Sequence, residues 1–156
     1  MPIFMPQKLI AQNKKAFHEY SVLETYEAGI VLLGSEVKSC RMGKANLKDS
    51  YVRFEDGELY LVEAHISHYD WANRMNHDPL RSRKLLLHKQ EIKKLYGKIR
   101  EKGQTCVPLK MYFTEKSNVK VEIALVKGKT QYDRREEIRK KDVRREIERE
   151  LKGKRF

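Results

Sequence analysis

Apolar and polar residues alternate over short segments in the first four fifths of the chain, a pattern typical of antiparallel strands. Residues 119–126 have an apolar side chain at every odd position, with Lys120 and Glu122 between them. Residues 107–113 alternate too, and four apolar side chains are expected on one face: Val107, Leu109, Met111 and Phe113. Because the polar segment 115–118 separates the two runs, they are expected to form a hairpin. Pro108 has no N–H to donate, so it is expected at a strand start or a sheet edge.

A second hairpin is expected around Asp56-Gly57, a dipeptide favoured by type I′ turns, with arms at about 51–54 and 59–63. Two further strands are expected at 19–26 and 30–33.

Two helices are expected between the strands. One covers about 35–41, with Ser35 as its N-cap and Gly43 just beyond its end. The other covers about 89–102, where one apolar stripe lies on a polar helix: Ile92, Leu95, Tyr96 and Ile99. About six short strands with two helices predict a mainly β protein, a small antiparallel barrel of which the oligonucleotide-binding (OB) type is one example.

Charge divides the chain at about residue 127. The whole sequence carries a net charge of +12. Residues 127–156 supply half of that excess, and their apolar residues form a narrow column rather than a face wide enough to pack on a barrel. We therefore expect this tail to be disordered alone and to become helical on a charged partner. The positive charge favours polyanions, with nucleic acid first, an acidic membrane surface second and an acidic protein third.

No enzyme motif is found, because phosphate-loop, GxSxG and HExxH patterns are missing. His65 and His68 have no cysteine nearby in the sequence, so we expect neither a metal site nor a cofactor. Cys40 and Cys106 are expected to be free thiols in a reducing compartment. Since the apolar N-terminal stretches are too short for a signal peptide or a membrane span, the expected location is the cytoplasm, with no membrane partner.

Three basic clusters remain as candidate phosphate contacts. They are Lys14-Lys15, the segment 36–44 and the segment 81–84. Together on one barrel they would supply enough positive charge for a phosphate footprint. The residues alone thus indicate a basic, barrel-like RNA-binding protein with a cationic tail.

Three longer strings, in this order, are more specific than composition. They are GIVLLGSEVKSCRMGK at 29–44, HDPLRSRKLLLHK at 77–89 and KGKTQYDRR at 127–135. This set resembles the small protein B (SmpB) family, which binds transfer-messenger RNA (tmRNA, or SsrA RNA). The resemblance implies an OB-like barrel at 1–126 and a C-terminal tail at 127–156 that is helical on the ribosome.

The resemblance also implies two groups of site residues. Family positions that contact tmRNA match Asn13, Glu27 and Leu87. To these we add basic neighbours as expected RNA contacts: Lys14, Lys15, Lys38, Arg41 and Lys44. The expected ribosome-binding residues of the tail are Lys127, Gly128, Lys129, Tyr132, Asp133, Arg134 and Arg135. A positive φ at Gly128 would let the tail turn away from the barrel.

The function implied is ribosome rescue by trans-translation without catalysis. The protein, expected to be a monomer, would deliver alanyl-tmRNA with elongation factor Tu to stalled ribosomes. Its tail would lie near the decoding centre of the small subunit and enter the empty messenger channel. Composition alone leaves two alternatives: a generic single-strand RNA-binding barrel, and an interaction protein whose tail docks on acidic lipid or in a calmodulin-like groove.

Overall fold

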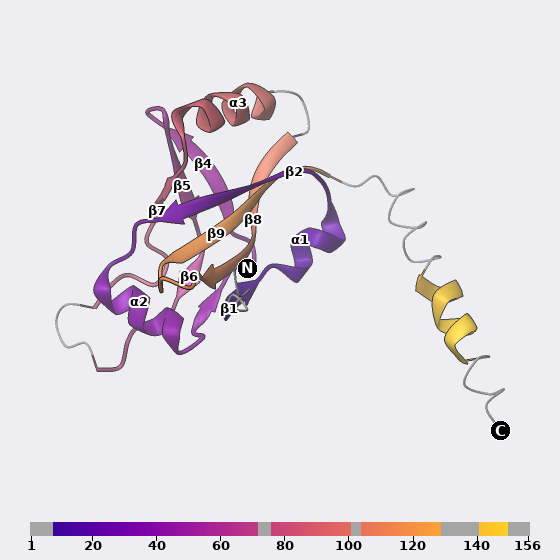
Figure 1. Cartoon of the computed structure of the whole chain (residues 1–156), viewed down its shortest axis with the longest axis horizontal. Helices are drawn as coiled ribbons and strands as arrows, with labels where there is room; N and C mark the ends of the chain where they lie inside the picture. Colours follow the sequence, from indigo (N-terminus) through magenta and orange to yellow (C-terminus); the bar gives the residue numbers. More distant parts are fainter. Residues whose placement is uncertain (1–7, 72–75, 101–103, 129–140, 150–156) are drawn as a thin grey trace, which may run out of the picture.

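A computed structural model describes residues 8–71, 76–100, 104–128 and 141–149. Its main feature is a seven-stranded antiparallel sheet in the order β1-β8-β9-β2-β7-β5-β4 (Figure 1). These strands are β1 (Lys8–Gln12), β2 (Tyr20–Ile30), β4 (Tyr51–Glu55), β5 (Glu58–Val62), β7 (Arg83–Leu86), β8 (Gln104–Phe113) and β9 (Val119–Gly128). A small second sheet pairs β3 (Ala45–Asn46) with β6 (His65–Ile66). The expectation of a mainly β protein with small helices is confirmed, and β4 also contacts β8.

Strands β8 and β9 pair as an antiparallel hairpin, as the alternation predicts, and lie between β1 and β2 in the sheet. The apolar side chains of β8 point only partly as expected, because a β-bulge shifts the register between Pro108 and Lys110. Met111 packs into the main core, whereas Val107 and Leu109 pack on the opposite face. The expectation of one shared face is therefore wrong for β8, since an extra residue reverses the alternation.

Pro108 lies in the middle of β8 and not at a strand start. It stands at the bulge and beyond the end of β1, which pairs only with the segment from Lys110 to Phe113. Both features make its missing N–H tolerable.

Strand β2 replaces the two separate strands expected at 19–26 and 30–33. It continues through Gly29, which pairs with Lys120 of β9 on one side and Leu86 of β7 on the other. Pairing on both sides sustains the strand across the glycine. Residue 19 belongs instead to helix α1 (Lys14–Glu19), which is not evident from the apolar pattern.

The β4–β5 hairpin agrees with the sequence. Asp56 and Gly57 both have positive φ, 51° and 76°, as a type I′ turn requires. Helix α3 (Lys89–Ile99) buries Leu95 fully, in accord with its apolar stripe.

Helix α2 (Gly34–Arg41) begins two residues earlier than a Ser35 cap would allow. Leu33 is the N-cap residue, and the Glu36 carboxylate accepts a hydrogen bond from its N–H at 2.8 Å. Gly43, with φ of 70°, follows the end of the helix as expected.

The sheet carries apolar clusters on both faces. The main core lies inside the curved sheet and includes Leu59, Leu85, Val121 and Ile123. A smaller cluster packs Ala16 of α1 against β8 and β9 on the other face. Helix α1 is thereby held against the sheet surface.

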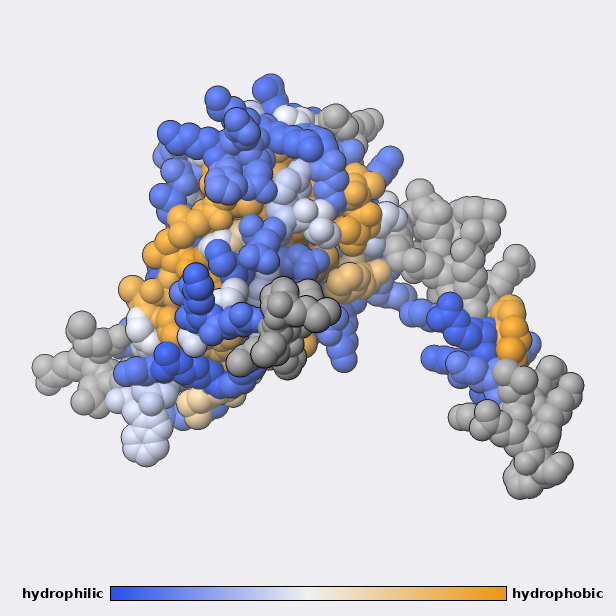
Figure 2. Space-filling model, in the orientation of Figure 1, coloured by the Kyte–Doolittle hydropathy of each residue, from blue (hydrophilic) through white to orange (hydrophobic). Residues whose placement is uncertain are grey.

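Residues 141–149 form a helix that stands away from the sheet in Figure 1 and is exposed along its whole length. Figure 2 shows it as hydrophilic except for a narrow hydrophobic column. Val143 and Ile147, four residues apart, are about half exposed. The narrow column agrees with the sequence pattern, while disorder of the tail in solution stays a prediction. Among the described helices, none is long and apolar enough to span a membrane.

Candidate RNA-binding surface

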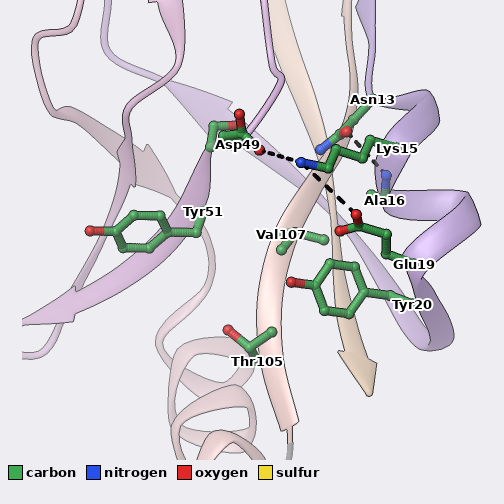
Figure 3. Close-up of a pocket in the computed structure, with 10 residues that line it drawn as sticks. Asn13, Lys15, Ala16, Glu19, Tyr20, Asp49, Tyr51, Thr105 and Val107 are labelled. Carbon is green, nitrogen blue, oxygen red and sulfur yellow. Dashed lines mark hydrogen bonds and ion pairs between the residues drawn. The ribbon is translucent and has the colours of Figure 1, made fainter. Parts of the chain in front are cut away.

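Asn13 caps the N-terminus of α1 and is buried (Figure 3). Its Oδ1 accepts from the Ala16 N–H at 3.2 Å, and its Nδ2 donates to the Pro108 carbonyl at 3.0 Å. Its own N–H donates to the Leu109 carbonyl at 2.7 Å. Because both ends of the amide are engaged, the side chain holds α1 on the bulged part of β8.

Lys14 and Lys15, which follow the cap, are exposed. The Lys15 ammonium lies 2.8 Å from Asp49 and 3.9 Å from Glu19 at the mouth of a cleft of about 330 Å³ between α1 and the start of β4 (Figure 3). The hydrogen bond and charge of Asp49 raise the pKa of Lys15 above its usual value. Lys15 therefore stays cationic, but two carboxylates share its charge.

Glu27 lies on the outer face of β2, where Tyr112 of β8 fixes its carboxylate. The Tyr112 hydroxyl donates to Glu27 Oε2 at 2.5 Å. Burial, and then this hydrogen bond, raise the pKa of Tyr112, so the phenol remains a donor. Lys110 extends the network, with its ammonium 5.5 Å from the Tyr112 ring centre and 3.3 Å from Glu122. Glu27 is thus exposed and oriented, with acceptor capacity left for a ligand.

Leu87 is half buried and packs on the main core, whereas its neighbour Leu86 is 51% exposed. Leu86 lies beside Gly29, whose missing side chain leaves it room: a Cβ there would come within 3.2 Å of the Leu86 Cβ. The exposed apolar contact at this position is therefore mainly Leu86. In Figure 2 hydrophobic surface gathers on this flank, near the end of β2, where Val31 and Leu33 are also exposed.

Helix α2 presents exposed cations from its last turn and the loop after it. Lys38, Arg41 and Lys44 are all exposed. Lys44 pairs with Asp70 at 3.5 Å, and the Lys38 ammonium lies 5.4 Å from the Tyr69 ring centre. Lys8 joins them, since its ammonium donates to the Arg41 carbonyl at 3.4 Å. We call Lys8, Lys38, Arg41 and Lys44 the α2 cationic cluster.

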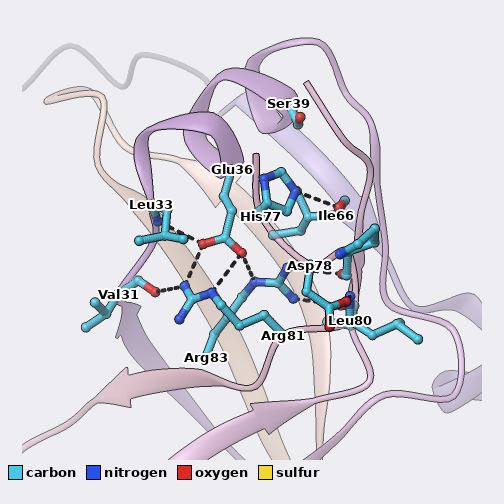
Figure 4. A network of polar contacts seen from close by, with 12 residues as sticks. Val31, Leu33, Glu36, Ser39, Ile66, His77, Asp78, Leu80, Arg81 and Arg83 are labelled. Atoms are coloured by element: carbon cyan, nitrogen blue, oxygen red, sulfur yellow. Dashed lines mark hydrogen bonds and ion pairs between the residues drawn. The ribbon is translucent and has the colours of Figure 1, made fainter. Parts of the chain in front are cut away.

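The third basic cluster, at 81–84, is mostly a structural network rather than a phosphate footprint (Figure 4). Arg83 and Glu36 are fully buried and joined at 2.5 Å. Arg81 also contacts Glu36 at 2.5 Å. Burial alone would raise the pKa of Glu36, but hydrogen bonds from Arg81, the Leu33 N–H and Arg83 hold it below its usual value. The Glu36 carboxylate therefore ties α2 to the start of β7 and to Arg81 just before it.

His77 is a buried residue that the sequence does not single out (Figure 4). Its Nε2 lies 2.8 Å from the Ile66 carbonyl and its Nδ1 2.8 Å from Ser35 Oγ. Ser35, expected as a helix cap, is thus a partner of this ring. Within the described residues, no three histidine, cysteine or acidic side chains are grouped to hold a metal ion.

Of the expected tail residues, Lys127 and Gly128 are described and end β9. Gly128 pairs with Tyr20 of β2 in extended conformation. The expectation of a positive φ at Gly128 is wrong, because its pairing with β2 keeps the backbone extended at this residue. The other expected tail residues lie outside the described part of the chain: Lys129, Tyr132, Asp133, Arg134 and Arg135.

Known proteins resemble this chain over nearly its whole length. The model of the family described as SmpB protein matches residues 10–153. The SsrA-binding protein of Sulfurihydrogenibium sp. (strain YO3AOP1) is 59% identical over 150 residues, which cover 96% of this chain and 98% of the relative. That of Symbiobacterium thermophilum is 59% identical over 144 residues, covering 92% and 91%. A chain from the solved structure "tmRNA-SmpB: a journey to the center of the bacterial ribosome" is 48% identical with a TM-score of 0.67, covering 86% of this chain and 96% of that one.

Proposed function

Because this chain belongs to the SmpB family, we propose that it binds tmRNA, delivers it to stalled ribosomes and takes part in trans-translation without catalysing a reaction. The observation that carries the proposal is the near-complete match to proteins named for binding SsrA RNA, at 59% identity over 96% of this chain. The ribosome as partner is supported by the likeness to the tmRNA–SmpB structure. The net charge of +12 suits both RNA partners.

The tmRNA-binding surface combines three features of the molecule. Lys14 and Lys15 on α1 would contact phosphates, and Asn13 contributes by holding α1 in place. Glu27 would accept a hydrogen bond from a base amine or a ribose hydroxyl, because a carboxylate repels phosphate. Leu86 and Leu87 would pack on an exposed base face, with Leu86 the more accessible.

The α2 cationic cluster would add phosphate contacts through three of the expected residues: Lys38, Arg41 and Lys44. Such contacts fix orientation more than sequence. Recognition of a folded RNA by shape then needs few base-specific hydrogen bonds.

The tail is the proposed ribosome-sensing segment. Residues 127–156 hold thirteen Lys and Arg against seven Asp and Glu. An empty messenger channel is lined by phosphate and would order this cationic segment, whereas a filled channel would exclude it. Tyr132 would stack on a ribosomal base, and Arg134 and Arg135 would pair with phosphates.

The remaining parts of the proposal follow from this role. The curved sheet, in which β4 reaches β8, supports an OB-like barrel for 1–126 with the tail at 127–156. The protein would act as a monomer in the cytoplasm and reach the ribosome with elongation factor Tu through alanyl-tmRNA.

A reconstituted tagging reaction tests the proposal. Ribosomes stalled at the end of a message, alanyl-tmRNA and elongation factor Tu are combined with the protein, and addition of the tag peptide is measured. The wild type should support tagging, and Glu27→Arg should lose it together with tmRNA affinity. Asp133→Ala with Arg134→Ala should lose tagging while tmRNA affinity stays nearly intact. Tagging by the double variant at the wild-type rate contradicts the tail assignment.

A further inference from the structure

Trp71 is the most exposed large hydrophobic side chain of the described residues. It is 78% exposed, while the next in rank reach only 53%. Scattered exposed leucines and valines need no explanation, because protein surfaces contain many of them. An indole buries a large area when it finds a partner and is enriched at binding sites. A side chain of this size left so exposed therefore indicates a ligand.

Trp71 lies in the segment that borders the α2 cationic cluster. Its neighbour Asp70 pairs with Lys44 at 3.5 Å, and Tyr69 lies under the Lys38 ammonium at 5.4 Å. The backbone joins the two segments as well, because the Ser67 N–H donates to the Lys44 carbonyl at 3.0 Å and Ser39 Oγ donates to the Ser67 carbonyl at 2.7 Å. These contacts hold the start of the 67–71 segment against α2.

Charge favours an anionic partner at this place. The cluster brings four cations together, and the described residues give Lys38 and Arg41 no ion pair with a carboxylate. Glu36, on the same helix, is turned inward and neutralised by Arg81 and Arg83. A planar ring on a segment that borders unpaired cations can bind an unpaired nucleotide, with the base on the ring and the phosphates on the cations.

We propose that Trp71 stacks on an unpaired RNA base whose flanking phosphates contact the α2 cationic cluster. This extends the proposed function, on which it rests, by adding a stacking residue to the RNA-binding surface. The nucleotide belongs either to tmRNA or to the ribosomal RNA of the small subunit. Both share the chemistry of a base between two phosphates.

Trp71 is the sole tryptophan of the chain, so its fluorescence reports on this one residue. Full-length protein is titrated with tmRNA and, separately, with 16S ribosomal RNA in about 200 mM salt. Stacking should quench the tryptophan emission in at least one titration. Filter binding then compares the wild type with Trp71→Ala and Trp71→Phe for the same RNA. We expect Trp71→Ala to lose about 10-fold in affinity, the scale of one stacked base, and Trp71→Phe to recover most of it.

Two controls separate stacking from charge and from unfolding. Leu23→Ala removes another exposed apolar side chain, 46% exposed and on β2, and should leave RNA affinity unchanged. Lys44→Gln should reduce the slope of log affinity against log salt by about 0.7–0.9, whereas Trp71→Ala should leave that slope unchanged. Circular dichroism should give the same spectrum for all variants.

The outcomes distinguish this inference from the proposed function. Selective tmRNA binding by the wild type, with no quenching by either RNA and equal affinity of Trp71→Ala, overturns the stacking inference alone. Failure of the wild type to prefer tmRNA overturns the proposed function itself. A blue-shifted emission with phosphatidylglycerol vesicles, without quenching by either RNA, would assign Trp71 to a membrane surface instead and also overturns the inference.

Discussion

Replacing Glu36 by Gln tests the buried network that joins α2 to the start of β7 and to Arg81 just before it. One oxygen of Glu36 accepts from the Leu33 N–H at 2.8 Å and from Arg81 at 2.5 Å, and the other accepts from Arg83 at 2.5 Å. The amide of Gln keeps the shape but replaces one oxygen by an NH₂ group, which would face a donor. It also removes the charge that compensates Arg83, which is fully buried. Breaking a buried ion pair from one side costs about 3–5 kcal/mol, a large part of the stability of a small domain.

Urea unfolding followed by circular dichroism measures this loss. The matched control is Glu55→Gln, which breaks the 2.8 Å pair of Arg53 and Glu55 at a site where both side chains are about half exposed. That change should cost less than about 1 kcal/mol. A loss below about 1 kcal/mol for Glu36→Gln as well would refute the idea that this carboxylate stabilises the fold.

The pH dependence of the same variant gives an independent check. The pKa of Glu36 lies below its usual 4.5 in the folded protein, so its charge stabilises the fold fully above about pH 4.5. This contribution is lost as the pH falls through the depressed folded pKa. The stability difference between the wild type and Glu36→Gln should therefore be constant from neutral pH down to about 4.5 and shrink below it. A difference that grows on acidification would contradict the assignment.

Three smaller changes complete the predictions. Burial raises the pKa of Cys40 to about 11 and that of Cys106 to about 12. A thiol reagent at pH 8 should therefore label both cysteines slowly in the native protein and rapidly in urea. Fast labelling of the native protein would contradict their burial. Gly57→Ala should destabilise the β4–β5 hairpin by about 1 kcal/mol in urea unfolding, because φ is 76° there, and an unchanged midpoint would argue against the type I′ turn. Tyr112→Phe removes the hydroxyl that donates to Glu27 and should cost about 1 kcal/mol of stability. It should also lower tmRNA affinity, but by less than Glu27→Arg does. Full tmRNA affinity would mean that the orientation of Glu27 does not matter.

Local chemistry explains which parts of the fold could be predicted from the sequence. Asp56-Gly57 fixes a turn by itself, and the stripe on α3 is set by helical spacing, so both were predicted correctly. The side of the sheet on which Val107 packs could not be predicted, because the bulge after Pro108 depends on how β8 pairs with β9. The continuity of β2 through Gly29 likewise depends on partners from distant parts of the chain.

In the candidate site too, the sequence indicates residue types, whereas burial and contacts depend on the folded structure. The family resemblance gives Asn13 as an RNA contact and the basic cluster at 81–84 gives Arg83, but burial decides what these two side chains are free to do. Asn13 uses both ends of its amide to hold α1, and Arg83 is enclosed with Glu36. The sequence alone does not separate Trp71 from the aromatic residues of the core, and only its 78% exposure does so.

Selective binding to tmRNA is the most direct test of the account. Purified full-length protein is titrated with tmRNA and with a structured RNA of equal length in about 200 mM salt, where contacts that depend on charge alone weaken strongly. The account predicts tight binding to tmRNA and a much weaker interaction with the control RNA. Equal binding to both would mean that the net charge of +12 is sufficient to explain RNA binding, and would contradict the proposed function.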